Sequence, residues 1–290
     1  MTSPLLSVPA SAPAVASQPA PSPGWQAHLS LGFTLRGRQT VLSERRQYGP
    51  LTVQRPFYPE GMPSHLYLLH PPGGVVGGDE IEVQVRVGEG AHALLTTPGA
   101  TKFYRSAGPQ SRVTQAFEVA AGGALEWLPQ DNILFPGANL HLHSTFHLAA
   151  GARLLAWECL SLGRPVNRER FTGGCLLSRW QVYREQRLCL NESVRVLDDR
   201  DLDRRAGLAG YPLVATLLAT PATEEDRERI RTVLAGYPAP AGVTLLGDLL
   251  VVRLLGAENE PLQQRMQTIW QTLRPTVMGC PACRPRIWNT

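Results

Sequence analysis

Apolar and polar residues alternate along much of the chain between residues 26 and 197. The clearest run is residues 81–87, IEVQVRV, where every second residue is apolar, as in a strand with one buried face. Shorter strand-like runs lie at residues 66–69, 94–97, 116–119 and 125–128, with Gly and Pro between them. This pattern predicts a body built mainly from short β-strands.

A weak internal repeat indicates how these strands are arranged. Gly90, Gly122 and Gly151 lie about 30 residues apart, and each separates two strand-like runs. Repetition at this period favours layers that stack and share one core, although a simple meander of hairpins would give a similar pattern. We therefore expect a mainly β fold with β-helix-like stacked sheets.

The last third of the chain has a different pattern, which predicts a small C-terminal α/β flank. Thr223 precedes three acidic residues, an arrangement typical of a helix start. Asn259 is a second candidate cap, and Pro275 is expected to end the second helix. Between the helices, residues 243–246 and 249–253 are predicted to form buried strands. Apolar residues of the second helix recur at helical spacing and are expected to pack in the core: Leu262, Met266, Ile269, Trp270 and Leu273.

Composition narrows the class of protein. The chain has 290 residues, 43% of them hydrophobic and 18% charged, with a net charge of +4. No basic run is interleaved with aromatics, and no apolar stretch approaches the roughly 20 residues of a membrane helix, so neither nucleic acid nor a membrane is an expected partner.

The chain is expected to divide into a tail and one domain. Residues 1–23 are rich in Pro, Ala and Ser and carry no charged side chain, which predicts a flexible tail before a single domain over residues 24–290. Prolines interrupt every apolar run of the tail, so it does not resemble a signal peptide. The five scattered cysteines do not suggest a disulfide framework. A cytoplasmic protein is expected.

A glycine-rich stretch at residues 73–78, GGVVGG, raises the question of a phosphate site. Gly73 and Gly78 have the spacing of a phosphate loop, but Asp79 and Glu80 stand where Lys and Ser/Thr are required. A strand follows instead of a helix. The glycines are therefore expected to allow a turn and a close backbone approach, and the turn presents Asp79. Two further stretches dense in Pro, Gly and polar residues, 96–106 and 126–138, are expected to serve binding.

Several motifs together resemble the urease accessory protein UreD family, called UreH in some organisms. The resemblance runs from about residue 25 to residue 290. The matching segments are GPLTVQRPFYP (49–59), HLYLLHPPGGVVGGD (65–79), TTPGATKFYRS (96–106), EWLPQDNILFPGA (126–138), LSLGRP (160–165) and PRIW (285–288).

The resemblance implies a β-helix-like fold with a few helices and no catalysis. It implies a maturation factor that binds apo-urease and UreF, and through UreF the GTPase UreG. Ni²⁺ is expected to pass through an internal channel toward the urease active site, so no cofactor is bound permanently.

A channel for Ni²⁺ needs oxygen or nitrogen ligands that release the ion, because thiolates and clustered imidazoles hold transition ions tightly. Asp79 and Thr101 are carried over from the family motifs, with turn capping and an ordinary strand-end hydroxyl as their alternatives. Glu158 lies in an apolar run, where burial of an unpaired charge is unfavourable unless water or an arginine such as Arg164 is near. Glu192 is similar, although Arg195 could pair with it. Asp131 could be a ligand or could cap its local turn.

Histidines and cysteines offer weaker candidates. His141, His143 and His147 share one face of a predicted strand, where an exposed polar face explains them better than metal binding. The motif Cys280-Pro-Ala-Cys283 could suggest zinc or redox chemistry, but it lacks a second pair.

Two alternative functions remain open at this point. The chain could be a scaffold that does not conduct nickel. It could also be a β-solenoid enzyme that acts on acidic polysaccharide, with Asp79, Asp131 and Arg105 as catalytic groups, although fold alone does not give function.

Overall fold

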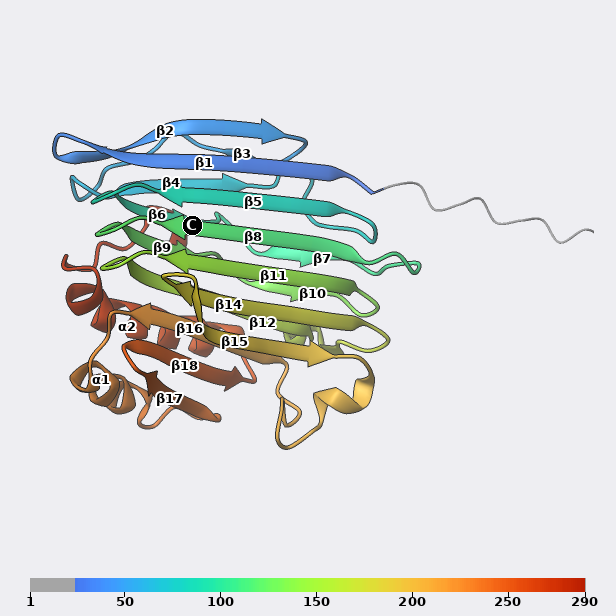
Figure 1. Ribbon diagram of the computed structural model, residues 1–290. Helices are drawn as coiled ribbons and strands as arrows, with labels where there is room; N and C mark the ends of the chain where they lie inside the picture. The colour runs from blue at the N-terminus through green and yellow to red at the C-terminus, as the bar shows by residue number, and fades with distance from the viewer. Residues whose placement is uncertain (1–23, 290) are drawn as a thin grey trace, which may run out of the picture.

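Two β-sheets lie against each other and form the body of the molecule (Figure 1). The computed structural model describes residues 24–289, and the predicted flexible tail lies outside the described residues. Between β5 and β14 the chain passes alternately between the two sheets, so that each circuit adds one strand to each of them. The seven-stranded sheet has the order β15 (Arg187–Val196), β14 (Cys175–Arg184), β11 (Asn139–Leu148), β8 (Ser111–Val119), β5 (Glu80–Val87), β1 (Gln26–Arg36) and β2 (Gln39–Tyr48).

The second sheet lies behind the first and carries the C-terminal strands at one edge. Its main path is β17 (Ala241–Leu246), β18 (Leu249–Gly256), β16 (Leu213–Thr220), β12 (Arg153–Arg164), β9 (Ala124–Leu128), β6 (His92–Thr96), β4 (Ser64–Leu69) and β3 (Thr52–Val53). Three short strands lie off this path: β7 (Thr101–Phe103), β10 (Asn132–Leu134) and β13 (Glu169–Arg170).

The repeat predicted from the glycines is confirmed, and it produces parallel strands in register. Gly90, Gly122 and Gly151 all have positive φ, between 63° and 68°, a conformation that glycine adopts without steric cost. The strands that follow these turns, β6, β9 and β12, pair in parallel, with His92 beside Ala124 and Ala124 beside Arg153. The fold is therefore a β-solenoid of stacked coils, as the alternating pattern and the repeat predicted.

The stacking places equivalent side chains beside one another in the space between the sheets. Phe117 of β8 and Phe146 of β11 are register partners, and their rings stack with centroids 4.7 Å apart. Burial of such apolar ladders removes a large nonpolar area from water, which is the main favourable contribution to folding. The core between the sheets therefore runs along the stack.

Two α-helices form the flank in the described part of the chain, α1 (Glu224–Leu234) and α2 (Asn259–Val277). Thr223 caps α1 as predicted, because its side chain accepts a hydrogen bond from the Asp226 amide and the Asp226 carboxylate accepts one from the Thr223 amide. Short 3₁₀ turns lie at Pro165–Asn167, Asp199–Leu202 and Arg286–Asn289. No described helix has both the length and the apolar character needed to cross a membrane.

Three expectations for the flank were wrong. Glu258, not Asn259, is the cap residue of α2, and α2 continues past Pro275 to Val277. Pro275 lacks only its own backbone donor, and the helix continues beyond it because Val277 is buried in the core. Strand β17 is an edge strand and is largely exposed, so only β18 of the two C-terminal strands is buried.

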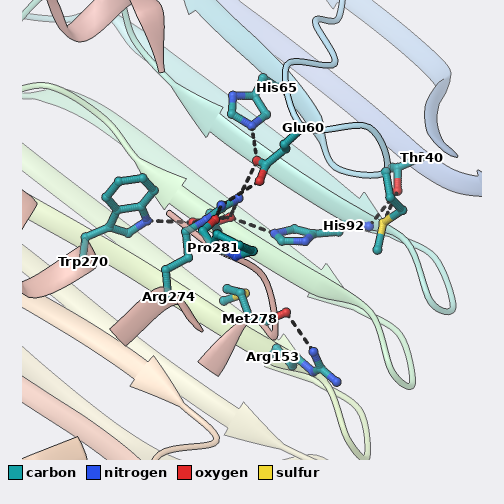
Figure 2. A network of polar contacts seen from close by, with 11 residues as sticks. Thr40, Glu60, His65, His92, Arg153, Trp270, Arg274, Met278 and Pro281 are labelled. Carbon is teal, nitrogen blue, oxygen red and sulfur yellow. Dashed lines mark hydrogen bonds and ion pairs between the residues drawn. The ribbon is translucent and has the colours of Figure 1, made fainter. Parts of the chain in front are cut away.

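Helix α2 is fastened to the second sheet by a buried ionic network (Figure 2). Glu126 of β9 is fully buried, and its carboxylate accepts hydrogen bonds from Trp270 Nε1 at 2.7 Å and from Arg274 Nε at 3.0 and 3.1 Å. His92 Nε2 lies 2.8 Å from Glu126 Oε1. Arg274 is also fully buried and donates two hydrogen bonds to Glu60, at 2.7 and 2.5 Å.

This network keeps Glu126 charged. Burial by itself would raise the pKa of Glu126, but hydrogen bonding to His92 and the charge of Arg274 outweigh it and hold the pKa at about 2. A buried charge pair with all its hydrogen bonds made is tolerated, whereas removal of one partner leaves an uncompensated charge. The position of α2 on the sheet therefore depends on Arg274.

We expect Arg274→Met to lower the free energy of unfolding by about 3–5 kcal/mol, because Glu126 would remain buried without its cationic partner. Urea unfolding followed by circular dichroism measures the change. Arg231→Met is the matched control, since Arg231 forms an exposed ion pair with Glu228 on α1 and should contribute less than about 1 kcal/mol. Equal losses in both variants would show that the network does not hold α2.

Candidate functional site

A cavity of about 250 Å³ lies in the space between the two sheets. Most of its wall is apolar and aromatic, with Phe103, Trp127 and Trp180 among its lining residues. Several polar side chains interrupt this apolar wall, and we name the space the inter-sheet cavity. The polar lining residues are His70, Thr97, Thr101, Gln115, Asn132 and Glu158.

The short strands β7 and β10 place two of these polar groups next to each other. They pair in parallel with Thr101 beside Asn132, and β10 continues the pairing to β12 with Asn132 beside Leu160. Side chains of directly paired residues point to the same face of a sheet. Thr101 was predicted from the motif, whereas Asn132 was missed. The repeat of about 30 residues could have found it, because Asn132 occupies the position of Thr101 in the next coil.

Glu158 is the acidic group of the inter-sheet cavity. It is 7% exposed, and its Oε1 accepts a hydrogen bond of 2.7 Å from the Ser178 hydroxyl on β14. The pKa of Glu158 is raised to about 7, mainly by burial and in smaller part by the charge of Glu192, while Ser178 and the nearby Trp180 indole oppose the shift. Arg164, the expected partner, instead makes a bidentate ion pair with Glu169. Glu158 therefore exchanges a proton near neutral pH.

A second, much smaller space of about 10 Å³ lies on the other side of Glu158. Glu158, Ser178 and Trp180 line it together with Glu192 and Thr216. Because Glu158 and Trp180 line both spaces, they form the partition between the inter-sheet cavity and Glu192. The structure thus places Thr101 and Glu158 in the lining of the inter-sheet cavity, and Glu158 and Glu192 in the lining of the smaller space.

Glu192 faces inward from β15 and has an arginine partner, but not the one expected. Its carboxylate accepts two hydrogen bonds from Arg253 of β18. Arg195 is exposed, and strand alternation places it on the opposite face of β15 from Glu192. The residue that pairs with Glu192 is 61 positions away in the sequence, so local spacing could not identify it.

Asp79 and Asp131 lie outside the lining of both spaces. The Asp79 carboxylate accepts hydrogen bonds from the backbone amides of Trp25 at 2.8 Å and Val76 at 2.9 Å, which corresponds to the turn-capping alternative. The Asp131 carboxylate accepts hydrogen bonds from the side-chain amides of Asn259 and Gln263 at the start of α2. Both carboxylates thus have structural partners.

The glycine-rich stretch holds two segments close together. A Cβ atom on Gly74 would lie 2.3 Å from the Tyr104 ring, and one on Gly77 would lie 2.2 Å from the Ser106 hydroxyl. Val75 N donates to Lys102 O at 2.7 Å across this contact. The close backbone approach expected of these glycines is therefore present, and Gly73 and Gly74 also line the inter-sheet cavity.

The other candidate ligands lie away from this route. The His141 and His143 rings stack 6.4 Å apart on β11, and His143 Nε2 lies 2.9 Å from Gln181 Oε1. Burial raises the pKa of the Cys280 thiol to about 11 and also raises the pKa of Cys283, so neither is a thiolate at neutral pH. Within residues 24–289, no group of three or more His, Cys, Asp and Glu side chains is placed to hold a metal ion.

Taken together, the fold and the cavity define a class of protein, a β-solenoid with a largely apolar space between its sheets into which a few polar side chains project. The family model described as UreD urease accessory protein matches residues 26–289. The chain therefore belongs to the UreD family of urease accessory proteins. These are maturation factors rather than enzymes, which confirms the expected absence of catalysis and disfavours the polysaccharide-acting alternative.

Relatives described as urease accessory protein UreD align over nearly the whole chain. The relative from Pseudomonas putida strain GB-1 is 53% identical over 267 residues, which cover 92% of this chain and 95% of the relative. The relative from Citrobacter koseri is 49% identical and covers 92% of each chain. The relative from Alkalilimnicola ehrlichii is 47% identical over 285 residues, 97% of each chain.

The raised pKa of Glu158 predicts a specific pH dependence of stability. An acid whose folded pKa of about 7 exceeds its unfolded value of about 4.5 stabilises the fold fully below pH 4.5 and loses that contribution as the pH rises through 7. Relative to Glu158→Gln, the wild-type free energy of unfolding should fall by about 2–3 kcal/mol between pH 5 and 8. Urea unfolding at several pH values measures this, and parallel curves for the two proteins would contradict it.

Proposed function

We propose that the chain is a scaffold of urease maturation that holds apo-urease and passes Ni²⁺ through the inter-sheet cavity. The observation that carries the proposal is the position of Glu158, which lines both the cavity and the smaller space that leads to Glu192. A cation that enters beside Thr101 and Asn132 would meet Glu158 and then Glu192. Nickel is the cargo here, not a resident cofactor.

The chemistry of the lining suits an ion in transit. The polar groups within the mostly apolar lining of the two spaces are hydroxyl, amide and carboxyl groups and the imidazole of His70, and no cysteine is among the lining residues. Oxygen ligands bind Ni²⁺ less tightly than thiolates, so they permit release. Glu158 can lose its proton to a passing dication and regain it afterwards, because burial places its pKa near neutrality.

The proposal includes the partners that the family resemblance implies. UreF would bind this chain and UreG would join through UreF, so that nucleotide hydrolysis by UreG supplies the energy for transfer. The glycine-rich stretch of this chain, residues 73–78, packs against other segments of the same chain. This agrees with a complex in which a partner, not this chain, binds the nucleotide. The five cysteines are all free, which favours the reducing cytoplasm as the place of action.

A scaffold that does not conduct nickel is the competing function, and carboxylate removal separates the two. We expect Glu158→Gln with Glu192→Gln to lower the nickel content of urease about tenfold at limiting nickel, because both acidic oxygen ligands of the route are lost. Inductively coupled plasma mass spectrometry of urease purified from cells that carry the maturation genes measures this. Co-purification with apo-urease reports whether the scaffold is intact.

Glu82→Gln with Glu118→Gln is the matched control for this experiment. These two substitutions remove the same charge as the first pair. Glu82 on β5 is partly exposed and Glu118 on β8 is exposed, and neither residue lines the inter-sheet cavity or the smaller space. Nickel content should then remain unchanged. If the Glu158 and Glu192 variant still co-purifies with apo-urease and yields fully nickel-loaded urease, the chain is a scaffold that does not conduct nickel.

A further inference from the structure

A row of three side chains crosses the second sheet from the buried acid to solvent. Glu158 of β12 pairs with Thr216 of β16, and Thr216 pairs with Arg253 of β18. Directly paired residues of antiparallel strands project to the same face, so all three side chains face the space between the sheets. Glu158 is buried, whereas the Arg253 side chain is 47% exposed.

The opposite wall of this space belongs to the last two strands of the first sheet. Trp180 of β14 pairs with Glu192 of β15, and β15 is the edge strand that closes the stack in Figure 1. The smaller space lies between these residues and Glu158 and Thr216. At this edge, the Glu192 side chain is 17% exposed, so of the two acids that line the smaller space it is the more accessible to solvent.

Arg253 occupies both oxygens of that acid. Its Nε donates to Glu192 Oε1 at 2.5 Å, and its Nη2 donates to Glu192 Oε2. The two-point geometry of a guanidinium matches a carboxylate, and the guanidinium stays charged at every physiological pH. A divalent cation that binds Glu192 must therefore displace Arg253 and overcome its repulsion.

We propose that Arg253 is a gate residue that closes the solvent end of the route by holding Glu192 in a bidentate ion pair. The proposal rests on the proposed function, since it regulates the same route. Arg253 is half-exposed, so its guanidinium can exchange Glu192 for water without disturbing the packed core. When it does so, Glu192 faces Glu158 across the small space, and the two carboxyl groups become available to one cation.

The affinity of the purified full chain for Ni²⁺ tests this gate, measured by competition with a chromophoric metal indicator. Arg253→Gln should bind Ni²⁺ roughly threefold to fivefold more tightly than wild type, the range expected when a partly exposed ion pair no longer competes. Adding Glu192→Gln to this variant should abolish the gain, because the uncovered ligand is removed. Circular dichroism checks that each variant is folded.

Arg195→Gln is the matched control, because it removes the same charge from the opposite face of β15 and should leave the affinity unchanged. The gate is overturned if Arg253→Gln binds no more tightly than wild type or does not bind detectably. It is also overturned if the gain persists without Glu192 or appears in Arg195→Gln.

The gate and the conduit fail in different experiments. Tighter binding by Arg253→Gln together with fully loaded urease from the Glu158 and Glu192 variant would show that Arg253 shields Glu192 from Ni²⁺ but would reject conduction, and with it the role of Arg253 as a gate of that route. If Arg253→Gln binds Ni²⁺ as wild type does, and urease matured with the Glu158 and Glu192 variant is poor in nickel, conduction is supported and the gate is rejected.

Discussion

The burial of carboxylates in the second sheet is the constraint on which the rest of this structure depends. Glu126 of β9 and Glu158 of β12 lie in neighbouring strands, and both are buried. Glu126 faces α2 and contacts Arg274 and His92, so its pKa stays near 2. Glu158 faces the inter-sheet cavity and has a hydroxyl instead of a cation beside it, so its pKa rises to about 7. A buried glutamate thus stays charged and binds Arg274 on the face beneath α2, whereas a buried glutamate on the cavity face exchanges a proton near neutral pH.

Two arginines that pair with acids in this part of the fold differ in their solvent exposure. Arg274 is fully buried and joins Glu126 to Glu60, so its loss would leave two acids beneath α2 without their cation. Arg253 is half-exposed and contacts one acid at the open edge of the stack. A buried ion pair is difficult to break one partner at a time, whereas an exposed pair contributes little to stability and exchanges with water. Loss of Arg274 should therefore destabilise the fold more than loss of Arg253.

The solenoid explains why polar groups far apart in sequence lie beside one another in the space between the sheets. Each coil adds one strand to each sheet in register, so residues one repeat apart become neighbours, as Thr101 and Asn132 do. The antiparallel strands added at the edge extend this order to Thr216 and Arg253. A urease accessory protein of this kind can line a passage without any local cluster of ligands, because stacking distributes one or two polar groups to each coil.

The sequence by itself determined the strand-rich body, the glycine turns of the repeat, the capped first helix and the family, because alternation, turn glycines and capping residues act locally. A family motif made Thr101 a candidate, and the position of an acid in an apolar run made Glu158, and less strongly Glu192, a candidate. The tertiary structure alone decided which acids line the two spaces between the sheets. Strand β12 is buried on both faces, so its sequence shows no alternation that could assign Glu158 to the cavity. The partners of Asp79, Asp131 and Glu192 lie 54 to 132 positions away, apart from Val76, and only the folded chain brings them within hydrogen-bonding distance.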